Sequence, residues 1–192
     1  MLSINKHDVW AFWPSSICEN FSDKIANKYI SGEYDFEIYT KFSVEEDVDQ
    51  RLTIISMLPT YVSYDLYNQW VNGIVVNTDD GVTGTQLEGL VKQGKIHELV
   101  WKNKKNSYFE VILDSEIIHI TKNFPMNKEM QILFGAGNIP SHEGNHNYCA
   151  LNLYEFKITV NNELLSYHTF DKFIENKSVD ITGNCNFIHK LT

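Results

Sequence analysis

The amino-acid sequence predicts an all-β protein, an antiparallel sandwich or jelly roll of two sheets, and three observations lead to this fold class. Apolar and polar residues alternate with a period of two in several short segments, as in half-buried strands. Gly, Pro, Asn and Asp separate these segments at the short intervals typical of sandwiches. No long helical pattern occurs, and roughly ten to fourteen short strands account for the chain. We expect one domain over residues 1–192, with residues 1–32 as an irregular segment packed on it.

The N-terminal half contains the clearest strand of the chain. Residues 9–13 are an apolar strand candidate that a proline ends, and residues 21–30 fit either a short helical turn or a loop. In residues 34–42, apolar residues and Thr40 share one face, opposite charged residues and Tyr39, which indicates a half-buried antiparallel strand. The elements expected after it are strands over residues 52–58, 61–67 and 70–76 and a long glycine-rich loop over residues 77–94.

A hairpin within residues 94–118 is the strongest local signal. Residues 96–101 and 109–113 are its two predicted strands, and residues 102–107, with three lysines and two asparagines, form the turn between them. Residues 114–116 are a second tight turn, after which a further strand begins. The alternation along these strands places seven side chains in one core, namely Phe36, Ile38, Phe42, Val100, Val111, Leu113 and Phe156.

The last third of the chain alternates between strands and polar turns. Residues 130–134 are a strand, and residues 136–147 are a second long polar loop, where binding residues often lie. A long strand over residues 149–160 ends at an Asn-Asn turn, and residues 164–170 form the return strand. Residues 179–191 are expected to supply one or two closing strands.

Composition excludes several classes of partner. The formal net charge is −9, from 25 acidic and 16 basic residues, so nucleic-acid backbones and anionic membrane surfaces are disfavoured. No apolar run approaches the roughly 20 residues that span a bilayer. No signal-peptide pattern is present, so a cytoplasmic location is the default expectation, and a cell-surface or virion location stays open.

The three cysteines, Cys18, Cys149 and Cys185, have no metal-binding spacing. Because their number is odd and no signal peptide is seen, we expect three reduced thiols and no disulfide. A single bridge between Cys18 and Cys185 stays open if the two chain ends lie side by side.

Several segments, in their order, resemble the concanavalin A-like lectin and glucanase superfamily in its laminin-G-like form. Residues 34–42 match an early strand of the type FTIEFWVKF, and residues 96–100 with 109–114 match a hairpin of the type W-H-x-V … L-Y-V-D-G. Residues 132–135 are similar to a strand opening with I-G, and residues 151–158 to a strand of the type I-D-D-V-R-I-Y.

Two positions depart from that family pattern: Ile96 stands where the hairpin tryptophan is expected, and Ser115 where the turn glycine is expected. The resemblance implies two antiparallel sheets packed face to face, one convex and one concave. It also implies sugar binding, as in many members, or protein adhesion or glycoside hydrolysis, as in others. The fold alone does not choose among these functions.

Glycoside hydrolysis is the least favoured of the three. Retaining enzymes need two carboxyl groups about 5–5.5 Å apart, and the glucanases of this superfamily carry an E-x-D-x-x-E strand that has no match here. Asp35 and Glu37 have a suitable spacing but lie on the wrong strand, where solvent-facing charges explain them. We therefore expect a protein that is not an enzyme.

Two groups of residues have metal-binding chemistry. Asp79 and Asp80 lie in a glycine-rich loop and are candidate calcium ligands, although Asp-Asp-Gly is also an ordinary turn. His142 and His146 are four residues apart, a zinc spacing on a helix, but the intervening Gly144 indicates a hydrogen-bonding loop instead. No other cofactor is expected.

Sugar binding needs flat apolar platforms for CH faces and planar polar groups for hydroxyls. The candidate platforms are Tyr61, Tyr64, Tyr67 and Trp70. The candidate hydrogen-bonding residues are Asn138, His142, Asn145 and Asn147. The ordinary alternative is that Tyr64 and Trp70 belong to the core and the other rings are surface tyrosines.

The sequence thus favours a non-catalytic, lectin-like module with a glycan ligand, associated with polysaccharide or cell-surface glycan machinery. Such a module would act within a parent polypeptide or as a homo-oligomer. The alternative is a structural or adhesion domain, such as a virion or tail component, and a glycoside hydrolase comes third.

Overall fold

The structure is a computed structural model, and it describes residues 1–5, 8–14, 34–45, 52–59, 64–68, 73–77, 85–88, 91–121, 130–135, 150–183 and 186–191. Within these residues the chain forms sixteen strands and no helix, so the described part contains no helix able to cross a membrane. The strands pair antiparallel in two sheets, which confirms the predicted fold class.

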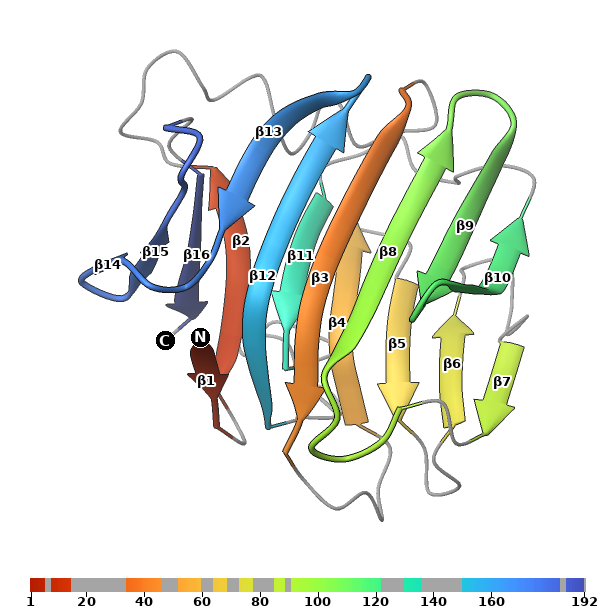
Figure 1. Cartoon of the computed structure of the whole chain (residues 1–192), viewed down its shortest axis with the longest axis horizontal. Helices are drawn as coiled ribbons and strands as arrows, with labels where there is room; N and C mark the ends of the chain where they lie inside the picture. The colour runs from red at the N-terminus through yellow and green to blue at the C-terminus, as the bar shows by residue number, and fades with distance from the viewer. Residues whose placement is uncertain are drawn as a thin grey trace.

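One sheet has seven strands, in the order β1-β12-β3-β8-β9-β10, with β13 also paired to β12. Its strands are β1 (Leu2–Ile4), β3 (Phe36–Val44), β8 (His97–Lys104), β9 (Tyr108–Leu113), β10 (Glu116–Thr121), β12 (Leu151–Val160) and β13 (Glu163–His168). Figure 1 shows this sheet in front of the second one, with β13, β12, β3, β8, β9 and β10 side by side.

The other sheet has nine strands, in the order β14-β15-β16-β2-β11-β4-β5-β6-β7. Its strands are β2 (Val9–Pro14), β4 (Leu52–Pro59), β5 (Tyr64–Asn68), β6 (Gly73–Asn77), β7 (Thr85–Glu88), β11 (Met130–Phe134), β14 (Phe173–Ile174), β15 (Lys177–Val179) and β16 (Asn186–Leu191). The two ends of the chain meet in this fold, because β2 pairs with β16.

The core lies between the sheets and is rich in aromatic rings. Phe156 belongs to the seven-stranded sheet, and Phe12 and Phe134 belong to the nine-stranded sheet. The centroid of the Phe156 ring is 5.3 Å from that of Phe12 and 5.4 Å from that of Phe134. Each fully buried phenylalanine stabilises the fold by about 1.5–3 kcal/mol relative to an exposed one. Six predicted core residues are buried as expected: Phe36, Ile38, Phe42, Val111, Leu113 and Phe156.

The prediction that Val100 belongs to the core is wrong. Leu99 and Trp101 face the core from β8, and Val100 lies half-buried on the outer face, opposite Tyr39 and Ile112. Three consecutive apolar residues do not reveal which alternate positions point inward. Pairing with β9 decides the phase, because Trp101 is opposite the buried Val111.

Element boundaries differ from prediction in several places. The strand β8 runs through Lys104, so the first three residues of the turn predicted over residues 102–107 are strand instead. The N-terminal segment expected to be irregular supplies β1 as well as the predicted strand β2. The expected loop over residues 77–94 contains β7, whose Gln86 pairs with Val75 of β6. The closing region contains the short strands β14 and β15 before β16. The expected helical turn or loop over residues 21–30 lies outside the described residues.

The predicted tight turns are present. Asp114 and Ser115 both have positive φ, 49° and 72°, and Asn161 and Asn162 have 48° and 67°. Two-residue hairpin turns with two positive φ angles match the twist of the flanking strands, and Asn and Asp tolerate that conformation better than most residues. Ser115 therefore occupies a backbone position that favours glycine.

Candidate functional site

Most of the residues predicted to bind a ligand lie outside the described residues, and these are Tyr61, Trp70, Asp79, Asp80, Asn138, His142, Asn145 and Asn147. The same is true of the three cysteines. Tyr64 and Tyr67 belong to β5 in the nine-stranded sheet, where β5 lies between β4 and β6. Their assignment as ligand platforms, and that of the calcium ligands, stays a prediction.

The described residues place a different group of functional side chains on the outer face of the seven-stranded sheet. Lys157 of β12 lies opposite Tyr167 of β13 on one side and Tyr39 of β3 on the other. Its ammonium nitrogen is 4.7 Å from the centroid of the Tyr167 ring and 4.9 Å from that of Tyr39. Local alternation on β12 produces this exposure, because Phe156 and Ile158 on either side point into the core.

Two carboxylates complete this group, which we call the tyrosine–lysine cluster (Tyr39, Glu98, Glu155, Lys157 and Tyr167). The Glu155 Oε2 atom is 2.8 Å from the Lys157 ammonium. The Glu98 carboxylate lies near the Tyr39 hydroxyl, whose pKa burial and this carboxylate both raise. The cluster therefore combines two aromatic rings, one cation and two anions on a half-exposed surface. Four neighbouring strands hold it: β13, β12, β3 and β8.

The protonation states in the cluster follow from these contacts. Burial, and then the carboxylates of Glu98 and Glu155, raise the pKa of Tyr39, so its hydroxyl stays protonated at neutral pH. Burial works to lower the pKa of Lys157, but Glu155, Tyr167 and Glu98 together outweigh it and the pKa is raised. At neutral pH the cluster thus offers a phenol donor, an ammonium donor and carboxylate acceptors.

The arrangement suits binding better than retaining glycoside hydrolysis. Glu155 and Glu98 are both opposite Lys41, on the strands to either side of it. Two strand spacings separate their backbones by roughly 9–10 Å, and each carboxylate is paired with a lysine, Glu155 with Lys157 and Glu98 with Lys41. Ring faces beside hydrogen-bonding groups instead match the alternation of CH faces and hydroxyls on a sugar.

The predicted interpretation of Asp35 as a structural charge fits its contacts. It forms an ion pair with Lys104 and accepts the backbone N–H of Lys105 at 2.7 Å. These hydrogen bonds, from Lys104 first and then Lys105, lower the pKa of the Asp35 carboxyl. Asp35 therefore anchors the turn between β8 and β9.

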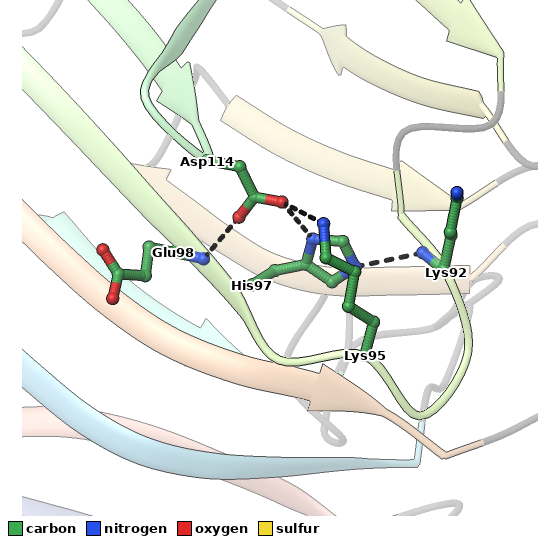
Figure 2. Close-up of polar contacts among 5 residues, drawn as sticks. All are labelled: Lys92, Lys95, His97, Glu98 and Asp114. Atoms are coloured by element: carbon green, nitrogen blue, oxygen red, sulfur yellow. Dashed lines mark hydrogen bonds and ion pairs between the residues drawn. The ribbon is translucent and has the colours of Figure 1, made fainter.

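A second polar cluster lies where β8 begins, beside the turn between β9 and β10 (Figure 2). Its centre is His97, whose side chain is fully buried. The backbone N–H of Lys92 donates to His97 Nε2 at 3.0 Å, so that nitrogen carries no proton and Nδ1 donates to Asp114 Oδ2 at 2.8 Å. Asp114 also accepts from the Lys95 ammonium at 3.0 Å and the Glu98 backbone N–H at 2.9 Å.

These contacts give His97 and Asp114 a structural role. Both ring nitrogens of His97 are already used, and Figure 2 shows both directed at protein atoms. Burial raises the pKa of Asp114, but hydrogen bonds from Glu98, Lys95 and His97 outweigh it and the pKa is lowered. The ionised carboxylate thus ties residues 92–97 to the hairpin turn. The sequence could have indicated that His97 and Asp114 lie close together, since both belong to the hairpin that resembles the laminin-G-like pattern.

Metal ligation finds no support among the described residues, where no group of three or more His, Cys, Asp or Glu side chains could hold an ion. Asp79 and Asp80 lie outside these residues, so their assignment as calcium ligands is unaffected.

Comparisons with known proteins relate the chain to others by structure. No protein-family model matches the sequence, and no curated protein matches it either. A candidate carbohydrate-binding protein from Bacteroides ovatus superposes with a TM-score of 0.63 at 11% identity, over 100% of this chain and 59% of that one. The enzymatically active domain of tailspike protein 2 from bacteriophage CBA120 gives 0.54 at 9% identity, over 77% of this chain and 28% of that one.

A third similar structure is the family 7 alginate lyase A1-II′, with a TM-score of 0.50 at 10% identity, over 73% of this chain and 67% of that one. Identities this low show the fold alone: a jelly roll of the concanavalin A-like kind. The chain spans about 59% of the length of the Bacteroides protein. The laminin-G-like form stays a prediction.

Proposed function

We propose that this protein is a non-catalytic carbohydrate-binding module whose ligand lies on the tyrosine–lysine cluster. The observation that carries the proposal is the position of Lys157 between the rings of Tyr39 and Tyr167, beside the carboxylates of Glu98 and Glu155. Phenol rings offer apolar edges and faces for sugar CH groups. The carboxylates and the ammonium accept and donate hydrogen bonds to hydroxyls.

Two further considerations support this function. The similar structures include a candidate carbohydrate-binding protein and an alginate lyase. The cluster also sits on paired strands, so little backbone entropy is lost on binding. The module is proposed to act in polysaccharide or cell-surface glycan machinery, within a parent polypeptide or as a homo-oligomer, with cytoplasmic location as its default.

The sequence-predicted platforms give a second location for the ligand. Tyr67 belongs to β5 in the nine-stranded sheet, whereas the tyrosine–lysine cluster belongs to the seven-stranded sheet. The two locations can therefore be tested separately, with Tyr67→Ala and Trp70→Ala for one, and Tyr39→Ala and Tyr167→Ala for the other.

The experiment is a glycan array followed by calorimetric titration of the best ligand. Because each hydrogen bond contributes only about 0.5–1.5 kcal/mol, we expect a Kd on the order of micromolar to millimolar. Tyr39→Ala and Tyr167→Ala should each weaken binding about tenfold, or about 1.4 kcal/mol. Tyr108→Ala is the matched control, because Tyr108 is a half-exposed tyrosine on β9 with no contact to the cluster.

Two results would contradict the proposal. Unchanged affinity in the Tyr39 and Tyr167 variants, together with loss in the Tyr67 and Trp70 variants, would move the ligand to the nine-stranded sheet. If the wild-type protein binds no glycan, the proposed carbohydrate-binding function is wrong.

A structural or adhesion domain is the second candidate, and exposed apolar side chains favour it. Ile117 and Ile120 on β10, an end strand of the seven-stranded sheet, are 59% and 58% exposed. Surfaces of this kind often mark assembly interfaces. Light scattering over a range of protein concentrations tests this candidate, because a stable oligomer that Ile117→Asn disrupts would support it and a monomer at every concentration would oppose it.

A further inference from the structure

The tyrosine–lysine cluster is one end of a longer row on the same face. Tyr39 lies opposite Val100 of β8, Val100 opposite Ile112 of β9, and Ile112 opposite Ile117 of β10. One straight row therefore crosses six neighbouring strands, which Figure 1 shows side by side. We call it the outer row, and its members are Tyr167, Lys157, Tyr39, Val100, Ile112 and Ile117. Five strand spacings make it roughly 24 Å long.

The apolar half of the outer row faces solvent. Ile117 is 59% exposed, and Val100 and Ile112 are half-buried on the side of the sheet that faces away from the core. Solvent-facing positions of an antiparallel sheet are normally polar. A continuous line of three aliphatic side chains beside two tyrosines is thus a surface that gains stability when something covers it.

Charged residues border the outer row on both sides, and their signs alternate. On one side the row Glu155, Lys41 and Glu98 crosses β12, β3 and β8, with Lys41 3.7 Å from Glu98. On the other side the row Glu37, Lys102 and Glu110 crosses β3, β8 and β9. The surface is therefore apolar along its centre and hydrogen-bonding along both edges.

The charge of this face excludes a polyanion as the preferred ligand. The two borders and Lys157 contain four glutamates and three lysines, a net charge of −1, on a chain with a net charge of −9. The Lys157 ammonium is already neutralised by Glu155 at 2.8 Å. A polyuronate would bring one carboxylate per sugar to a surface with no cation in excess.

We infer that the outer row is the track of a single uncharged polysaccharide chain, several sugar units long, that lies across the strands. This inference rests on the proposed function and adds to it the charge class and length of the ligand. The rings of such a chain present CH faces that cover the apolar centre, and their hydroxyls reach the charged borders on both sides. The tyrosine end binds the first units, and the aliphatic end binds those that follow.

Two measurements on the intact protein test the inference. Affinity electrophoresis compares neutral polysaccharides (β-glucan, xyloglucan and galactomannan) with the polyanions alginate and polygalacturonate, and we expect retardation by a neutral polymer only. Calorimetry then follows an oligosaccharide series of that polymer, from two to six units. We expect the Kd to fall by at least about tenfold along the series, or about 1.4 kcal/mol.

Variants then separate the two halves of the outer row. Ile117→Asn and Val100→Thr should weaken the six-unit ligand about fivefold or more and leave the two-unit ligand unchanged. The matched control is Ile120→Asn, because Ile120 is equally exposed on the same strand but lies opposite Glu110, outside the row. Melting temperatures of all variants show whether each one is folded.

The outcomes distinguish this inference from the proposed function. If the Tyr39 and Tyr167 variants lose binding, but affinity is independent of length and Ile117→Asn behaves like Ile120→Asn, the track is wrong and the function stands. Retardation by alginate or polygalacturonate in preference to every neutral polymer would also overturn the track. If the Tyr39 and Tyr167 variants bind normally, both the track and the proposed site are wrong. A change of oligomeric state in Ile117→Asn, with glycan affinity unchanged, would make the row an assembly surface and overturn the inference.

Discussion

Acidification should weaken this fold between pH 6.5 and pH 4 through one buried histidine. The His168 side chain is fully buried, and its Nδ1 lies 3.0 Å from the Ser178 hydroxyl. Its Nε2 has no hydrogen-bond partner within the described part of the chain. The rings of Phe12, Phe156 and Phe170 pack around it, 6.1 to 6.4 Å away between centroids. A proton on this imidazole would place a poorly solvated charge among the rings.

The magnitude follows from linkage. Burial lowers the pKa of His168 from 6.5 to about 4, although the nearby Asp180 carboxylate raises it. Between these values the unfolded chain binds a proton that the folded chain does not. The contribution of His168 is therefore fully present above pH 6.5 and is lost as the pH falls. The loss is about 2 kcal/mol at pH 5 and about 3 kcal/mol at pH 4, a large share of the 5–15 kcal/mol typical of a domain.

The assay is urea unfolding at pH 7.5, 6 and 5, compared between the wild-type protein and His168→Phe. The variant loses the hydrogen bond to Ser178 and so has a constant offset, but it has no proton to bind at this position. We expect the wild-type free energy of unfolding to fall by about 2 kcal/mol more than that of the variant between pH 7.5 and pH 5. Parallel pH curves would refute the reasoning.

Three further predictions concern the core, the hairpin turn and the thiols. Val111→Asp should unfold the protein, because a buried unpaired charge costs several kcal/mol. The control Val100→Asp, on the half-exposed outer face, should melt cooperatively. A cooperative melt of Val111→Asp would contradict the core assignment. Asp114→Ala should lower the free energy of unfolding by about 1–3 kcal/mol, because it leaves the buried His97 Nδ1–H without its acceptor. The control is Glu116→Ala, at an exposed position. Equal stability of the two variants would count against the structural role of Asp114. Thiol counting on the denatured, unreduced protein should find three free groups, and a count of one would show a disulfide.

Local alternation predicted most of the strands because each strand has one buried face. On β3 charged residues, a tyrosine and a serine separate the inward-facing residues, and on β9 Glu110 between Phe109 and Val111 sets the phase, so the inward face is visible without knowing the partner strand. On β8 it is not, since Leu99, Val100 and Trp101 are all apolar and only pairing with β9 selects the first and third. The strand β7 was not predicted, because its four residues include a single apolar residue and lie in a stretch rich in Gly and Thr.

The tyrosine–lysine cluster could not be predicted from local sequence. Tyr39 is visible as an outward-facing aromatic residue on a predicted strand, but Lys157 and Tyr167 lie more than 100 residues away along the chain. Strand order and register alone bring the three side chains into one row. The same holds for the outer row, whose six members come from six strands. The predicted loop residues, such as His142, lie outside the described residues, so that assignment stays a prediction.

The most direct test of the glycan site is an NMR titration of the isotopically labelled protein with the neutral oligosaccharide that the array selects. We predict that the backbone amides whose resonances shift most belong to Tyr39, Lys157 and Tyr167 and to their neighbours on β3, β12 and β13. Shifts confined to strands of the nine-stranded sheet, such as β5, would contradict the location of the site. A spectrum unchanged at millimolar ligand would contradict carbohydrate binding itself.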